Sequence, residues 1–173
     1  MLGTSVGKTE RKEQDMEEKI SIEIFNWGPC VVKCKIKPEF KKLLLDEADT
    51  NKVDFRDKLA GQIDLETGYG EESKKKVLPT LAQYFGVYDQ AYERFTRKPY
   101  KARPEYILSA LWINYQKQNE FNPPHDHDGK LSFVIYLQIP EELKEENRKY
   151  IGKSCGPGGI QFLYGDGPRE CVT

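Results

Sequence analysis

The amino-acid sequence predicts an α+β fold in which helices pack on a mostly antiparallel sheet or barrel. Two observations carry this prediction. Apolar residues recur at helical spacing between residues 38 and 95, and the two most apolar stretches, 106–116 and 131–139, have the composition of buried strands. The chain has 173 residues, which is enough for one domain with a core of its own.

Composition and charge exclude several classes of protein. The formal net charge is −1, so the strong basic excess of a nucleic-acid-binding protein is missing. No run of about 18 apolar residues is present to span a membrane, and the segment KTERKEQDMEEK is too charged for a signal peptide. The cysteines lack zinc-ligand spacing, and we expect reduced thiols in the cytosol at Cys30, Cys34, Cys155 and Cys171.

The N-terminal elements follow from local patterns. Residues 1–18 are polar and densely charged, and we expect them to form a mobile arm ahead of a single domain over 19–173. Apolar and polar residues alternate over 20–28 with β-branched isoleucines, and a second β-prone stretch covers 30–36. The Asn-Trp-Gly-Pro sequence between them is typical of a turn, so we predict two strands joined by that turn.

Helical patterns occupy the middle of the chain. A proline near the start and apolar residues at helical spacing predict an amphipathic helix over 37–49. The stretch 52–70 predicts one helical turn followed by an extended segment. A long helix is expected over 71–95, and Pro79 and Gly86 either bend it or mark its start. Its apolar stripe is expected to pack on a sheet and consists of Leu78, Leu81, Phe85, Tyr88, Tyr92 and Phe95.

The second half of the sequence has the composition of a sheet with long loops. Residues 106–116 and 131–139 are apolar at both odd and even positions, which predicts strands covered on both faces. A short polar helix is expected over 140–150. Residues 156–167 predict a strand and turn bounded by glycines.

The chain has two histidines, and both stand in one loop mouth as His125 and His127, beside Asp126 and Asp128. In an extended chain, side chains two residues apart point the same way, so the two imidazoles are expected to converge. Nitrogen ligands of this kind suit iron, zinc, copper or nickel. The alternative interpretation is that two polar histidines decorate an exposed loop, with the aspartates as incidental neighbours.

The stretch LWINYQKQNEFNPPHDHDGKLSFVIYL resembles the core of the Fe(II)- and 2-oxoglutarate-dependent oxygenases, in particular a prolyl-4-hydroxylase-like branch found in T4-like marine phages and bacteria. In that branch a strand with tryptophan and asparagine, a loop ending in His-x-His or His-x-Asp, and an apolar strand follow one another. The resemblance covers about Tyr106 to Gly165. It implies a double-stranded β-helix, a cupin-like jelly roll with supporting N-terminal helices, and Fe(II), 2-oxoglutarate and O2 as cofactor and co-substrates.

Under this resemblance His125 matches the first metal-binding histidine of the family. The second ligand is usually a carboxylate two residues later, whereas this chain has His127 there. Three alternatives are open. His127 itself binds the metal, or a shifted backbone brings in Asp126 or Asp128, or His127 is the first histidine and Gly129 leaves the carboxylate place vacant. Strand alternation favours the first alternative.

Other family positions are matched less completely. Tyr115 is similar in position to a tyrosine that hydrogen-bonds 2-oxoglutarate, although an aromatic residue that fills the barrel is the other interpretation. The family also has a later metal-binding histidine and an arginine or lysine that pairs with 2-oxoglutarate. No histidine follows His127, so we expect the chain to be truncated before the last strands of the barrel and to be inactive by itself.

The resemblance implies a dioxygenase that hydroxylates its substrate while 2-oxoglutarate is decarboxylated to succinate. A cupin-like metal-binding or structural jelly roll without turnover is the alternative. The substrate is open between a protein residue, a nucleobase and a small metabolite. Barrel edges left open would allow a homodimer. We expect no membrane or nucleic-acid partner, and a cytoplasmic location, in the host cytoplasm if a phage encodes the chain.

Overall fold

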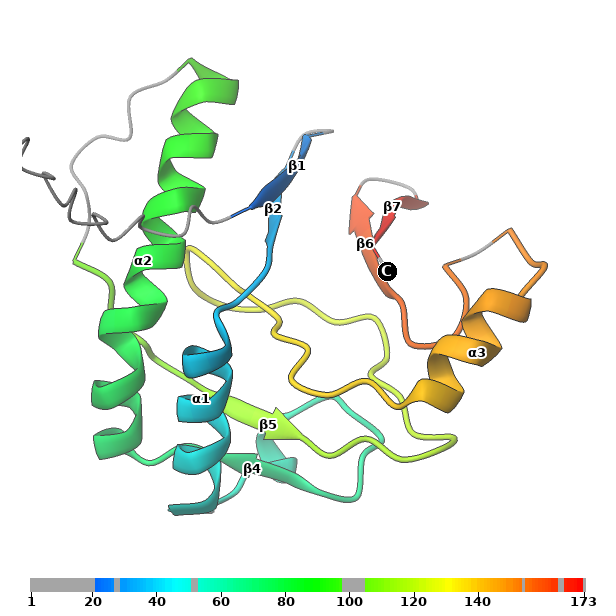
Figure 1. The fold of residues 1–173 in the computed structure, drawn as a ribbon, viewed down its shortest axis with the longest axis horizontal. Coiled ribbons are helices and arrows are strands. Elements are labelled where there is room, and N and C mark those ends of the chain that lie inside the picture. The colour runs from blue at the N-terminus through cyan, green and yellow to red at the C-terminus, as the bar shows by residue number, and fades with distance from the viewer. Residues whose placement is uncertain are drawn as a thin grey trace, which may run out of the picture.

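A computed structural model of the chain describes residues 21–26, 29–50, 53–97, 105–153, 155–164 and 167–172. The arm expected over 1–18 lies outside these residues. The elements run in the order β1 (Ile22–Asn26), β2 (Cys30–Cys34), α1 (Pro38–Thr50), β3 (Val53–Asp54), η1 (Arg56–Lys58), β4 (Glu66–Gly68), α2 (Glu71–Thr96), β5 (Trp112–Asn114), α3 (Glu141–Lys149), β6 (Ile160–Tyr164) and β7 (Gly167–Val172) (Figure 1).

The described strands form three small antiparallel sheets, β1–β2, β3–β4–β5 and β6–β7. The pairing of β1 with β2 confirms the two strands predicted over 20–36. The short helix η1 and the strand β4 confirm the helical turn and extended segment predicted over 52–70, and α3 and β6 confirm the polar helix and the glycine-bounded strand. These strands do not close into a barrel, and the jelly roll stays a prediction.

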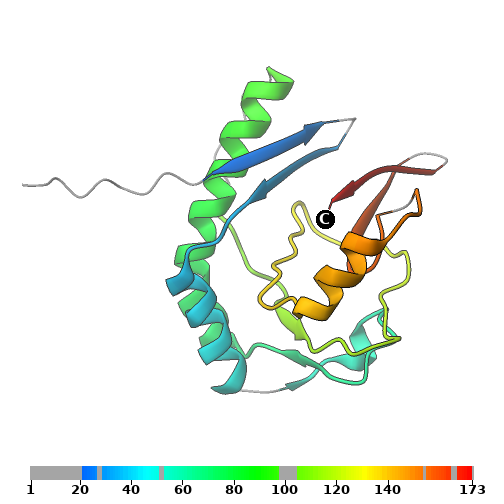
Figure 2. The ribbon, with the colours of Figure 1, turned by 45° about the vertical axis from the view of Figure 1, so that its right-hand side comes forward.

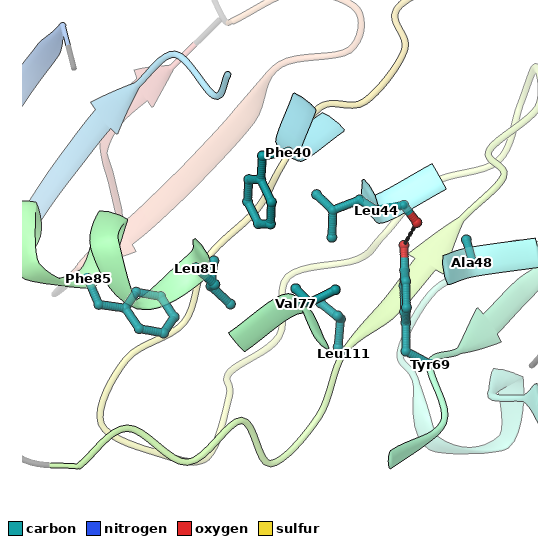
Figure 3. Packing of buried hydrophobic residues seen from close by; sticks show 8 residues of the cluster. All are labelled: Phe40, Leu44, Ala48, Tyr69, Val77, Leu81, Phe85 and Leu111. Carbon is teal, nitrogen blue, oxygen red and sulfur yellow. Dashed lines mark hydrogen bonds between the residues drawn. The ribbon is translucent and has the colours of Figure 1, made fainter. Parts of the chain in front are cut away.

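The core lies where α1 and α2 run side by side next to strands β4 and β5 of the three-stranded sheet (Figures 1 and 2). Figure 3 shows its buried side chains, which are Phe40, Leu44, Ala48, Tyr69, Val77, Leu81, Phe85 and Leu111. The Tyr69 hydroxyl donates a hydrogen bond of 2.9 Å to the Leu44 carbonyl. Burial raises the pKa of Tyr69 to about 12, so this phenol stays a donor at physiological pH.

The buried face of α2 differs from the predicted stripe. Most of the buried residues follow an i, i+4 row from Ser73 to Asp89, and the buried set shares only Leu81 and Phe85 with the prediction. Phe95 is 46% exposed. Helix α1 has 13 residues and α2 has 26, so α1 can cover only part of the longer helix. Helix α2 begins at Glu71, so Pro79 does not mark its start.

The apolar segment 131–139 forms none of the described strands and is covered on one face only, which corrects the prediction of a strand covered on both faces. Of the strand predicted over 106–116, only Trp112–Asn114 is formed. Leu131, Phe133, Ile135 and Leu137 pack against the core. Val134 is 62% exposed, and Tyr136 between the last two of those residues is 51% exposed. The alternation shows an extended chain with one face toward the helices. None of the described residues forms a second layer over the exposed side of this segment. No helix among the described residues has the length and apolar character to cross a membrane.

A buried carboxylate links the two long helices. Glu47 of α1 accepts a hydrogen bond of 2.7 Å from the Ser73 hydroxyl and one of 2.8 Å from the Lys76 ammonium, both on α2. The bond from Lys76, followed by that from Ser73, holds the pKa of the Glu47 carboxyl below its usual value. The ionised form of Glu47 therefore stabilises the packing of α1 against α2.

Replacing Glu47 with glutamine tests this link. A lowered pKa in the folded state contributes stability above the usual pKa of a glutamate, and that stability is lost as the pH falls through the lowered value. Glu47→Gln is therefore expected to lower the urea midpoint at neutral pH, with a difference that narrows in acid. The matched control is Asp46→Asn, because Asp46 makes an exposed ion pair with Lys42; its effect is expected to be within about 0.5 kcal/mol. A constant difference at every pH would contradict the role of the charge.

Candidate metal site

The site is built on the pairing of β4 with β5, because a strand pair places alternate residues on opposite faces. Leu111 and Ile113 belong to the side that packs against the core. Alternation turns Trp112 and Asn114 to the other side, together with Gly68, which is the register partner of Trp112. We call this side of β4–β5, marked by Gly68, Trp112 and Asn114, the outer face.

A row of rings crosses the outer face. The Phe55 ring stacks on Trp112 with centroids 5.9 Å apart, and the His127 ring lies 6.0 Å from Trp112 at an interplanar angle of 35°. Gly68 lies beneath the first ring, since an added Cβ would stand 2.7 Å from Phe55 Cδ2. The ammonium of Lys58 lies 5.0 Å from the Phe55 ring centroid. Packing on Trp112 thus positions the imidazole of His127.

The loop after β5 carries the histidines and is held by backbone contacts near its start. The Gln62 N–H donates a hydrogen bond of 2.8 Å to the Phe121 carbonyl. The Glu120 carboxylate accepts hydrogen bonds of 3.0 Å from the Asp64 N–H and 2.6 Å from the Lys117 N–H. These hydrogen bonds join the loop to the segment before β4, so the start of the loop that carries the histidines is fixed relative to the β4–β5 pair.

The two imidazoles converge, as alternation along an extended segment predicts. Nε2 of His125 lies 3.0 Å from Nε2 of His127, and the ring centroids are 4.6 Å apart with an interplanar angle of 75°. A histidine nitrogen stands about 2.1 Å from a bound transition metal, so two neighbouring octahedral ligands stand about 3.0 Å apart. The observed separation fits two ligands of one metal ion, and it also fits one N–H···N hydrogen bond.

The other ring nitrogen of His125 is engaged by the backbone. Nδ1 lies 2.7 Å from the Pro123 carbonyl oxygen, which can only accept a hydrogen bond. Nδ1 must therefore carry the proton, and the neutral ring presents its lone pair at Nε2. A metal-binding histidine commonly has this arrangement, in which a carbonyl orients the ring and fixes its tautomer.

The aspartates of the motif do not extend the pair into a larger site. Asp126 and Asp128 are exposed, as are His125 and His127. Among the residues that the structure describes, no three His, Cys, Asp or Glu side chains are grouped closely enough to hold a metal ion. The donors fit two positions of a coordination sphere and leave the others to water or to a bound small molecule.

The structure does not bring Tyr115 to the histidines. The Tyr115 N–H donates to the Leu65 carbonyl at 3.0 Å, which continues the β4–β5 ladder by one residue. Alternation then places Tyr115 on the same side as Ile113, opposite the outer face of Trp112. Its proposed contact with 2-oxoglutarate gains no support from this placement and stays a prediction.

Sequence reasoning missed a buried polar pair on the outer face. Glu66 and its register partner Asn114 both have side-chain oxygens without a hydrogen-bond partner among the described residues. Desolvation, followed by the charge of Glu120, raises the pKa of Glu66. An acidic residue inside an extended segment was the only local signal, and it does not reveal a pairing partner so distant in sequence.

Replacing Gly68 with alanine tests the aromatic row. The new Cβ would overlap the Phe55 ring, so Gly68→Ala is expected to displace this ring from Trp112 and to cost about 1–3 kcal/mol of unfolding free energy. Near-ultraviolet circular dichroism and urea unfolding measure the two effects. Gly86→Ala is the control, because nothing lies within 4 Å of its added Cβ in α2, and it is expected to stabilise by roughly 0.5–1 kcal/mol. Equal effects of the two changes would contradict the close contact.

No protein-family model, curated protein or solved structure matches this chain.

Proposed function

We propose that the chain binds a divalent transition-metal ion through Nε2 of His125 and Nε2 of His127, as part of the iron site of an Fe(II)- and 2-oxoglutarate-dependent dioxygenase. The observation that carries the proposal is the 3.0 Å separation of the two Nε2 atoms. The hydrogen bond of Nδ1 to Pro123 supports it, because it leaves the His125 lone pair facing His127. The resemblance of residues 106–165 adds the oxygenase chemistry.

In such enzymes the iron supplies the oxidation of the substrate, coupled to decarboxylation of 2-oxoglutarate. The residues of this chain contribute position. Trp112 packs on His127, Pro123 orients His125, and the exposure of both rings leaves coordination positions open to a co-substrate. An open site of this kind is typical of catalytic metal centres, whereas structural centres are closed by protein ligands.

A cupin-like metal-binding protein without turnover is the second candidate. The observation in its favour is the small donor set, since the described residues supply two converging ligands and no third. Both candidates require metal binding by the histidine pair. Only the oxygenase requires that 2-oxoglutarate bind at the same place.

Metal binding can be followed through the fluorescence of Trp112, whose ring lies 6.0 Å from His127. In a Trp27→Phe background, in which Trp112 is the remaining tryptophan, Co(II) is expected to quench the emission in a saturable titration. His125→Ala and His127→Ala are each expected to weaken binding by about tenfold or more, because one of the two protein ligands is lost.

The aspartates provide the matched controls for this titration. Asp126→Asn and Asp128→Asn change side chains of the same loop without removing an imidazole. Unchanged Co(II) affinity in both variants is expected if the histidines alone bind the metal. A loss in either variant would show that a carboxylate is a ligand, and saturable binding that survives both histidine changes would refute the site.

The oxygenase chemistry is tested by thermal melting of the protein with Mn(II), with and without 2-oxoglutarate. Mn(II) is expected to raise the melting midpoint. 2-Oxoglutarate at about 100 times its Kd is expected to add about 2.7 kcal/mol, in the presence of the metal only. His125→Ala is expected to abolish both shifts. A shift with Mn(II) and none with 2-oxoglutarate would favour the cupin-like protein, and no shift with either would contradict both candidates.

A further inference from the structure

Glu66 has the least favourable environment of the described carboxylates if it is ionised. Its side chain is 1% exposed, and neither carboxylate oxygen has a hydrogen-bond partner among the described residues. An isolated charge in such a place is expensive, because the water that solvated it is not replaced by donors. A buried glutamate in this situation takes up a proton unless a cation or donor reaches it.

The register of the sheet places another unsatisfied oxygen directly across from Glu66. Glu66 is paired with Asn114, whose Oδ1 is buried without a donor. The Tyr115 N–H donates to the Leu65 carbonyl, so Leu65 and Tyr115 form a hydrogen-bonded pair. Because the two kinds of pair alternate along an antiparallel ladder, Glu66 and Asn114 form the closer, non-hydrogen-bonded kind. Side chains in such pairs approach within contact distance.

Backbone and charged groups close the surroundings of the carboxylate. A Cβ on Gly61 would stand 2.9 Å from Glu66 Oε1, so the chain covers this oxygen closely. The charged groups that act on Glu66 are Glu120 of the loop after β5 and Arg56 of η1. Arg56 is already engaged by Asp54, to which its Nε donates at 2.9 Å, and does not neutralise Glu66.

We propose that Glu66 carries a proton at neutral pH and donates a hydrogen bond to the Asn114 side-chain oxygen across β4 and β5. One proton then removes the buried negative charge and supplies a donor to the Asn114 oxygen, which otherwise has none. This arrangement requires only a proton from the solvent and no bound metal ion or small molecule. The inference is independent of the proposed metal function.

The direction of the pKa shift agrees with this geometry. Desolvation and then the charge of Glu120 raise the pKa of Glu66, and Arg56 opposes them. A raised pKa of an acid in the folded state gives stability that is complete below the usual pKa and is lost as the pH rises through the raised value. The β4–β5 pairing is therefore expected to weaken as the solution becomes alkaline.

This pairing is a pH-sensitive contact next to the histidine pair. Asn114 shares the outer face with Trp112, and Trp112 contacts His127. Loss of the proton from Glu66 would place an unpaired charge beside the strand that positions the ring of His127. The environment of Trp112 thus reports the state of Glu66.

The variant Glu66→Gln tests the proposal, since glutamine keeps the shape and supplies a permanent donor to Asn114. Urea unfolding from about pH 4 to about pH 8 is the measurement, so that the series starts below the usual pKa of a glutamate. The midpoint of the wild type is expected to fall with rising pH relative to that of Glu66→Gln, with equal midpoints near the acid end. Glu120→Gln is the control, and it is expected to show a smaller decline that ends at a lower pH, because removing this repelling charge lowers the pKa of Glu66.

Infrared spectroscopy gives a second readout that does not depend on unfolding. A carboxylic-acid carbonyl band at neutral pH that is present in the wild type and absent in Glu66→Gln is expected. No such band, or a Glu66→Gln protein that is less stable than the wild type by the same amount at every pH, would overturn the proposal and show that Glu66 is ionised.

Discussion

The alternation of side chains along β4 and β5 is the constraint on which the rest of the site depends. Burial of Leu111 and Ile113 against the helices decides which way the strand faces, and this leaves Trp112 and Asn114 on the outer face. A shift of one residue in register would exchange the two sets. The apolar core therefore determines the position of His127, which packs on Trp112 without itself being buried.

The histidine pair has an electrostatic property that follows from its geometry. Two imidazole nitrogens 3.0 Å apart can both direct a lone pair at one cation between the rings. The Pro123 carbonyl accepts a hydrogen bond from Nδ1 of His125, so a cation shared by the two rings would lie at the Nε2 atoms. The geometry of the two nitrogens is compatible with a single bound cation, which both proposed functions require.

Local periodicity predicted the elements whose neighbours are close in sequence. The β1–β2 pair, α1, α2 and α3 followed from spacing, turn residues and composition, and so did the convergence of His125 and His127. The pairing of β4 with β5 was not predicted, because about 45 residues, including all of α2, separate Gly68 from Trp112. For the same reason the pairing of Glu66 with Asn114 on the outer face was overlooked. The expectation for Tyr115 came from the resemblance and not from local pattern, and it stays a prediction.

The two faces of the β4–β5 pair affect the site in different ways, because one packs against the apolar core and the other has a buried carboxyl group. The core accepts only small changes in volume, and it holds the strand in one register. The outer face has a carboxyl group that can gain or lose a proton, and its register partner Asn114 belongs to the strand of Trp112. If the proposed cation binds at the histidine pair, a neutral Glu66 leaves no unpaired negative charge buried in the sheet beside it. The two proposals therefore make compatible demands on the residues of β4, β5 and the loop that follows.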